Sequence, residues 1–169
     1  TEMSIKQAED EMPIEPNVVY LIPPKKNLTL KNGKIVLSEY VQGKLNHPID
    51  VFFTSLAEEK KEKGIAVVLS GTGSDGTCGI KAIKEKGGLV LVQSPGTAKF
   101  DGMPRSVINT GLADFILSPD EIADEILNFS NHPDLIRLEE QEVLFADEET
   151  FLQIYAVLKK ASGIDFTNY

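Results

Sequence analysis

The feature that most constrains the fold of this chain is an alternation of short apolar runs with helical patterns. Two runs, at residues 65–69 and 89–93, are rich in Val, Ile and Leu, as in strands that are covered on both faces of a parallel sheet, and a third strand is expected over residues 113–117. Helical patterns over residues 77–86 and 103–109 separate them. This alternation predicts an α/β domain with a doubly wound, mostly parallel sheet.

Two further β elements precede this repeat. Val18 to Ile22 has the composition of a strand, which Pro23-Pro24 ends. Residues 28–31 and 34–37 are joined by Asn32-Gly33, the two-residue signal of a tight hairpin turn. The chain is therefore expected to carry a β-hairpin beside the parallel sheet.

Two helices flank the repeat. Residues 48–63 have helical periodicity. The side chains expected on the buried face of this helix are Val51, Phe52, Ser55 and Leu56. Residues 118–121 (Ser-Pro-Asp-Glu) combine a capping serine, a proline at the first helical position and a glutamate at the third, so another helix should begin there. It is expected to end near Phe129.

The length of 169 residues exceeds one domain of about 150 residues by a short remainder. We expect a domain over residues 1–129 that is truncated at its N-terminus, so that its sheet lacks the first strands. Residues 130–147 contain a proline and many acids, which predicts a linker, and apolar spacing in residues 148–169 predicts a C-terminal helical extension. Because an incomplete sheet exposes an edge, a homodimer through that edge is a further hypothesis.

Charge and cysteine content disfavour several classes of protein. The 17 basic and 26 acidic side chains give a net charge of −9, which opposes binding to nucleic acid and to anionic lipid. No apolar run approaches the ~20 residues of a membrane span, so no membrane insertion is expected. Cys78 is the only cysteine, and no paired Cys/His spacing predicts a metal site. A cytoplasmic protein is the resulting prediction.

The segment from Ser70 to Gly76 (SGTGSDG) leaves a predicted strand and opens a predicted helix. Its glycines match G-x-G-x-x-G, so a Rossmann-like nucleotide-binding domain is one alternative. The next strand, however, ends at Gln93-Ser94, where that class of site needs a ribose-binding acid. Asp75 would also place a carboxylate where the pyrophosphate should lie. Both observations disfavour a nucleotide site.

Asp75 suits a different task. A carboxylate is favoured at a helix N-terminus, and a rigid, ionised one can orient a histidine that deprotonates a serine. The alternative is that Asp75 only caps the helix that it precedes. Ser70 and Ser74 do not lie in a nucleophile-elbow motif and are expected to be loop hydroxyls. His47, before Pro48 at a helix start, is expected to cap that helix or to be solvated.

Residues 64–111 closely resemble the C-terminal half of the catalytic domain of the chemotaxis methylesterase (CheB) family. The segments IEPNVVYLIPP and HPIDVFFTSLAEE, upstream of them, resemble the same family, and the likeness covers about residues 5–128. The resemblance implies a Ser-His-Asp triad whose acid, in the motif GTGSDG, is Asp75. The family's serine and histidine precede the matched part, so this chain by itself is expected to be inactive.

The resemblance also implies a reaction and a partner. The reaction is hydrolysis of glutamate γ-methyl esters on the cytoplasmic helices of methyl-accepting chemoreceptors, without a cofactor. The backbone of Thr72 would belong to the oxyanion hole, where many relatives have methionine. Met103, Pro104 and Arg105 recur near the family's catalytic face and would contact the substrate. A non-catalytic receptor-binding module is the remaining alternative.

The end of the chain, FLQIYAVLKKASGIDFTNY, resembles the opening helix of the chemotaxis glutamate methyltransferase (CheR) family. This resemblance implies a protein in which a methylesterase is fused to a methyltransferase. The implied methyltransferase domain would use S-adenosylmethionine, which the present chain would not bind. The alternative is an amphipathic helix of generic composition.

Overall fold

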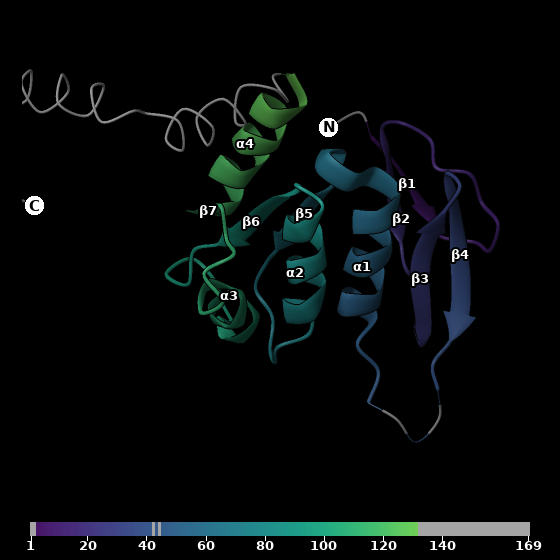
Figure 1. Cartoon of the computed structure of the whole chain (residues 1–169), viewed down its shortest axis with the longest axis horizontal. Helices are drawn as coiled ribbons and strands as arrows, with labels where there is room; N and C mark the ends of the chain where they lie inside the picture. The colour runs from purple at the N-terminus through teal and green to yellow at the C-terminus, as the bar shows by residue number, and fades with distance from the viewer. Residues whose placement is uncertain (1–2, 42, 44, 132–169) are drawn as a thin grey trace, which may run out of the picture. The chain divides into compact units, whose positions relative to one another are not determined.

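The structure is a computed structural model that describes residues 3–41, 43 and 45–131. The chain divides into one compact unit over residues 1–126 and a second from residue 127 onward. In the first unit, helices lie against a parallel sheet, and a β-hairpin packs on helix α1 (Figure 1). In chain order the elements are β1 (Ser4–Gln7), β2 (Val18–Leu21), β3 (Lys26–Lys31), β4 (Lys34–Glu39), α1 (Pro48–Lys60), the 3-10 helix η1 (Lys61–Lys63), β5 (Ile65–Val68), α2 (Thr77–Glu85), β6 (Leu89–Gln93), α3 (Gly102–Ile108), β7 (Phe115–Leu117) and α4 (Pro119–Asn131).

Strands β5, β6 and β7 form a three-stranded parallel sheet in that order. Helices α2 and α3 connect them, as the alternation predicted, and the α/β class is confirmed. The central strand β6 is buried at every position. The expectation that the first apolar run is covered on both faces is wrong, because Ile65 and Val67 of β5 are partly exposed and Leu69 lies beyond the strand.

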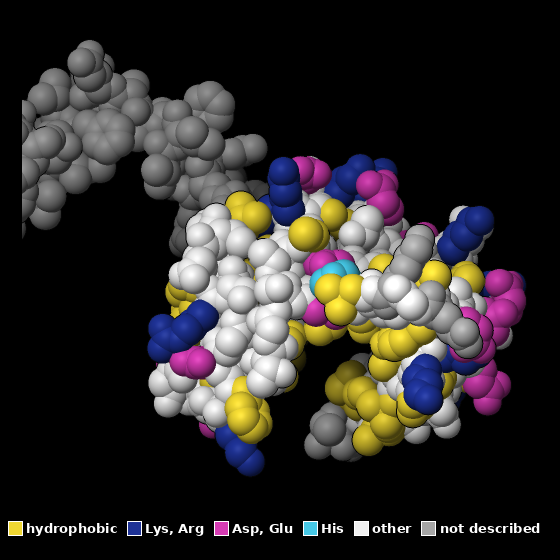
Figure 2. Space-filling model, turned by 90° about the horizontal axis from the view of Figure 1, so that it is seen from below, with side chains coloured by type: hydrophobic (Ala, Val, Ile, Leu, Met, Phe, Trp, Pro, Cys, Tyr) yellow, Lys and Arg dark blue, Asp and Glu magenta, His cyan; other side chains and the backbone are white. Residues whose placement is uncertain are grey.

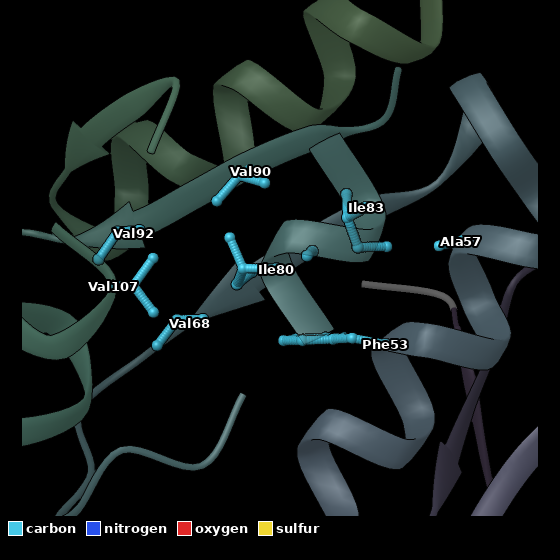
Figure 3. Packing of buried hydrophobic residues seen from close by; sticks show 9 residues of the cluster. Phe53, Ala57, Val68, Ile80, Ile83, Val90, Val92 and Val107 are labelled. Atoms are coloured by element: carbon cyan, nitrogen blue, oxygen red, sulfur yellow. The ribbon is translucent and has the colours of Figure 1, made fainter. Parts of the chain in front are cut away.

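The core of the first unit lies between this sheet and its helices (Figure 3). Ile80 and Ile83 of α2 are fully buried, and they lie between the valines of the strands and helix α1. Helix α1 contributes Phe53 and Ala57 to the core, whereas the predicted Val51 is exposed. The predicted face of α1 is therefore displaced by about one residue.

Helix α1 differs from the prediction because it packs against two neighbours, α2 and β3. Phe52 contacts the cores on both sides. On the side of the hairpin, Ser55 Oγ accepts a hydrogen bond of 3.1 Å from the backbone N–H of Leu30. The carboxylate of Glu59 accepts the N–H groups of Asn32 and Gly33 at 3.0 and 2.6 Å. These contacts attach the hairpin to α1.

The predicted hairpin is confirmed: β3 and β4 are antiparallel, and Asn32 and Gly33 turn between them with φ of 52° and 74°. Positive φ at both central residues is what a tight hairpin turn of this kind requires. The predicted strand at Val18 is also present as β2, which pairs in parallel with β1. Strand β1 was not predicted, because its residues have no apolar alternation.

Helix α4 begins as the sequence predicts. The carboxylate of Glu121 accepts hydrogen bonds from the N–H and the hydroxyl of Ser118, at 2.8 and 2.6 Å. Most of the predicted linker and all of the predicted C-terminal helix lie outside the described residues. Among the described helices, none combines the length and the apolar character needed to cross a bilayer.

Candidate active site

Asp75 lies in the loop after β5, where helices α1 and α2 both begin. Its Oδ2 accepts the backbone N–H of Ile49 at 3.1 Å, and its Oδ1 accepts that of Asp50 at 3.0 Å. Both amides belong to the first turn of α1, and no side chain caps α2 at its N-cap residue, Gly76. Asp75 therefore caps α1, and the alternative that it caps the helix that it precedes is wrong.

Asp50 completes a reciprocal arrangement. Its Oδ1 accepts the backbone N–H of Gly79, in the first turn of α2, at 2.8 Å. Two amides at the start of α1 thus bond to Asp75, which precedes α2, and one amide at the start of α2 bonds to Asp50 of α1. Because free N–H groups at helix starts carry partial positive charge, both carboxylates are stabilised there.

Two glycines permit this contact between the helix starts. A Cβ atom on Gly79 would lie 2.6 Å from Cβ of Phe53, and one on Gly76 would lie 2.9 Å from Cγ2 of Ile49. Gly76 also has a φ of 97°, a conformation that other residues rarely adopt. Glycine at these positions is therefore required by packing between α1 and α2, and not only by the turn.

His47 lies on the outer side of the two carboxylates. Its Nδ1 is 3.8 Å from Oδ1 of Asp75 and 4.0 Å from Oδ2 of Asp50, distances that are too long for hydrogen bonds. Figure 2 shows this histidine in cyan, flanked by acidic side chains and beside a hollow that apolar side chains border. The side chain of Asp75 keeps 21% of its surface exposed. Of the two roles expected for His47, capping is wrong, since its side chain makes no capping bond, and exposure to solvent is confirmed, since 44% of the side chain is exposed.

The three side chains His47, Asp50 and Asp75 could also be considered as metal ligands, because their donor atoms lie within 4.8 Å of one another. Three of the four carboxylate oxygens, however, already accept backbone N–H groups. Two helix starts supply the positive charge that a cation would otherwise provide. The arrangement is that of helix caps, and we assign no metal to it.

The glycine loop before Asp75 is held from two sides. The N–H of Ser70 donates to Oε1 of Gln93, at the end of β6, with a length of 2.8 Å. Gly71 donates its N–H to the carbonyl of Phe100, and its own carbonyl accepts the N–H of Met103. Gln93 is the only buried polar side chain in the described part of the chain. Its amide therefore fixes the loop to the centre of the sheet.

Thr72 is exposed at the tip of this fixed loop. Within residues 3–131, as far as they are described, no acceptor bonds to its backbone N–H. This amide is thus available to an oxygen atom of a ligand. Ser70, by contrast, uses its hydroxyl inside the loop, where it accepts the N–H of Phe100 at 2.9 Å.

The predicted substrate contacts Met103, Pro104 and Arg105 do not form one surface. Met103 packs on the core and against Gly71, where a Cβ atom would lie 2.4 Å from its sulfur. Pro104 is fully buried, so its side chain is not available to a substrate. Only Arg105 is exposed, and its Nε donates to Oδ2 of Asp101 at 2.6 Å. That hydrogen bond lowers the pKa of Asp101 below its usual value.

The described residues do not form a nucleophile and base pair, because no serine hydroxyl among them bonds to His47. They also disfavour the nucleotide-binding alternative. The N–H of Gly79, at the helix start where a phosphate would bind, is already bonded to Asp50. Two carboxylates at that place would repel a phosphate.

Comparisons with known proteins point to one family. The family model described as CheB methylesterase matches residues 1–126. Over 129 residues the chain is 43% identical to an uncharacterized 104.1 kDa protein of Rhodobacter capsulatus, covering 76% of this chain and 14% of that protein. It is 39% identical over 125 residues to a putative protein-glutamate methylesterase/protein-glutamine glutaminase of Leptospira interrogans, covering 72% of this chain and 64% of that protein.

A solved structure agrees with this match. The crystal structure of the Thermotoga maritima CheB methylesterase catalytic domain aligns with a TM-score of 0.68 and 35% identity, covering 76% of this chain and 71% of that domain. The chain thus spans less than two thirds of the length of the curated relatives described above.

Proposed function

Because the chain belongs to the CheB methylesterase family, we propose that it supplies the acid and one oxyanion amide of a protein-glutamate methylesterase site. The observation that carries this proposal is the placement of Asp75. Two backbone N–H groups hold its carboxylate in the loop between β5 and α2, and part of its surface stays open to a histidine. The serine and the histidine would come from the segment that precedes the matched part in the family's domain.

In the proposed reaction, the histidine removes the proton of the serine hydroxyl, and the serine oxygen attacks the γ-carbonyl carbon of a methylated glutamate. Asp75 accepts the Nδ1–H of that histidine and stabilises the imidazolium. The N–H of Thr72 donates to the oxyanion. The imidazolium then protonates the departing methoxide, which leaves as methanol, and water hydrolyses the acyl-serine to free glutamate and serine.

Two surface features support a site that is shared with a further segment. The face of the β1–β2 pair exposes Ile5, Val19 and Leu21, and the first two are register partners. A hollow bordered by apolar side chains lies beside the carboxylates (Figure 2). Apolar faces of this kind are stabilised when another element covers them. The preceding segment of the domain is the proposed cover.

The substrate would be a glutamate methyl ester on the cytoplasmic helices of a methyl-accepting chemoreceptor. The relative from Leptospira interrogans is also named a protein-glutamine glutaminase. The same serine attack on a glutamine carboxamide would release ammonia in place of methanol, so both reactions are proposed. Arg105 is exposed, and its guanidinium would bind an acidic receptor helix after its ion pair with Asp101 has broken.

The test compares two proteins in an assay of methanol release from a methylated receptor fragment. The first is the 169-residue chain. The second, called here the extended protein, has the family's preceding segment joined before residue 1, taken from the chain's own gene where it is encoded there and otherwise from the Thermotoga maritima relative. Only the extended protein should release methanol, and Asp75→Asn should lower its kcat by about 10⁴-fold. Equal release with and without Asp75 would refute the proposal.

A non-catalytic receptor-binding module remains a second candidate, favoured by the lack of a serine and histidine pair in the described residues. Binding of the receptor fragment by the extended protein, without any methanol release, would support it.

A homodimer through an exposed sheet edge is proposed as well, and light scattering that gives the mass of a monomer would exclude it. A cytoplasmic location belongs to the same proposal, since chemoreceptor signalling helices lie there.

A fusion with a methyltransferase is proposed from the likeness of residues 148–169 to the CheR family. Its domain would use S-adenosylmethionine, and no described residue bears on it. The test is methyl transfer from labelled S-adenosylmethionine to a receptor fragment by the complete gene product. Transfer supports the fusion, and its absence from a folded, complete gene product excludes it.

A further inference from the structure

Asp50 and Asp75 close a ring of contacts around the start of two helices. From Asp75 the backbone runs directly into α2, whose Gly79 donates its N–H to the side chain of Asp50 at 2.8 Å. From Asp50 the ring returns to Asp75, because the N–H of Asp50 donates to Oδ1 of Asp75 at 3.0 Å. The acid is thus bonded to α1, and α1 is bonded back to the helix that follows the acid.

This ring determines where the carboxylate of Asp75 lies. If the bond between Asp50 and Gly79 were absent, the start of α1 could move relative to α2, and the amides that hold Asp75 would move with it. The close contact at Gly79, where an added Cβ would lie 3.1 Å from the backbone of Asp50, leaves no room for a side chain between the helices. Ile49 and Phe53 also pack across this contact, but within the described residues Asp50 is the one side chain of α1 that accepts a hydrogen bond from the first turn of α2.

We propose that Asp50 is a positioning residue of the methylesterase site, which acts on the histidine through Asp75. The inference rests on the proposed function, and it adds a residue that the triad does not contain. Asp50 touches neither the substrate nor the reacting atoms. Its effect is geometric, since a displacement of a catalytic group by about 1 Å lowers a rate by roughly 100-fold.

Two substitutions separate the hydrogen bond from the charge of Asp50. In Asp50→Ala the acceptor for Gly79 is lost, and kcat of the extended protein should fall by about 10- to 100-fold while KM stays within about twofold. In Asp50→Asn the side-chain oxygen can still accept that N–H, so most of kcat should return. The matched control is Asp10→Ala, which also removes a carboxylate that accepts a backbone N–H, that of Leu37 at 2.8 Å, but in the hairpin region. Its kcat should be unchanged.

The outcomes distinguish this inference from the proposed function. Loss of activity in Asp75→Asn, with unchanged kcat in Asp50→Ala, overturns the positioning role and leaves the esterase assignment intact. A fall in Asp50→Asn as large as that in Asp50→Ala also overturns it, because charge would then be the cause. If Asp75→Asn keeps full activity, both the proposed function and the inference are refuted.

A second measurement does not depend on turnover. In the 169-residue chain, amide hydrogen exchange should quicken at Ile49 as well as at Gly79 in Asp50→Ala, because Asp75 loses its fixed position. Should Asp50→Ala fail to fold, Asp50→Ser, whose hydroxyl is a poorer but smaller acceptor, replaces it. Unchanged exchange at Ile49 overturns the proposal.

Discussion

Helix α4 and the pair α1 and α2 begin in different ways. At the start of α4, the carboxylate of Glu121 accepts the N–H and the hydroxyl of Ser118, only three residues earlier in the chain. The starts of α1 and α2 are capped by aspartates 25 to 29 residues away in the sequence. A local cap forms whenever its own turn forms. The bonds from Asp75 to α1 and from Asp50 to α2, called here the crossed caps, form only when both helices have docked. The geometry at Asp75 therefore depends on the assembled fold.

The largest effect should follow when the crossed caps are forced apart. Gly79→Val places a side chain against Cβ of Phe53, at 2.6 Å for Cβ alone, and should lower the free energy of unfolding by roughly 2 to 3 kcal/mol. Urea unfolding followed by circular dichroism measures it. Gly96→Ala is the control, since its Cβ would meet only Ser94 Oγ at 3.9 Å. An equal effect of both substitutions would contradict the close contact.

Removal of one crossed cap should have a smaller effect. Asp75→Ala leaves two N–H groups of α1 without their acceptor, and we expect a loss of about 1 to 2 kcal/mol in the free energy of unfolding. Asp124→Ala, an exposed position on α4, should change it by less than about 0.5 kcal/mol. If the two variants unfold at the same urea concentration, Asp75 does not stabilise α1.

Removal of the local cap should have a smaller and more confined effect. Ser118→Ala takes away the hydroxyl that donates to Glu121 and should cost about 0.5 to 1 kcal/mol at the start of α4. Hydrogen exchange should quicken in the first turn of α4 and stay unchanged at Ile49 and Gly79. A change at those two amides would show that the local cap is coupled to the site after all.

The smallest effect concerns pH. Hydrogen bonds from the hydroxyl and the N–H of Ser118 lower the pKa of Glu121 from its ordinary value of 4.5. Because the pKa of Glu121 is lower in the folded chain, its ionised carboxylate stabilises the fold fully above pH 4.5. That stabilisation is lost as the pH falls through the lowered pKa. NMR titration of the Glu121 carboxyl carbon measures this directly. Glu121→Gln should remove the pH step from hydrogen exchange in the first turn of α4, and a midpoint at or above 4.5 would contradict the hydrogen bonds.

Much of the fold could be predicted from the sequence because its signals are local. The hairpin follows from Asn32-Gly33, and the parallel strands follow from apolar runs that lie between helical patterns. The buried face of α1 could not be predicted correctly, because the helix packs between α2 and β3 and no single stripe describes two neighbours. The burial of Pro104 was likewise missed, since proline at a helix start is as compatible with a surface as with a core.

The sequence by itself identified the family and the glycine loop, and it predicted Asp75 as the acid of the site. Only the tertiary structure decided what holds that carboxylate: the amides of α1, with Asp50 reaching back to α2. The physical reason is distance along the chain. Hydrogen bonds that span 25 to 29 residues leave no pattern in a local window, and they exist only once the core has brought the two helix starts together.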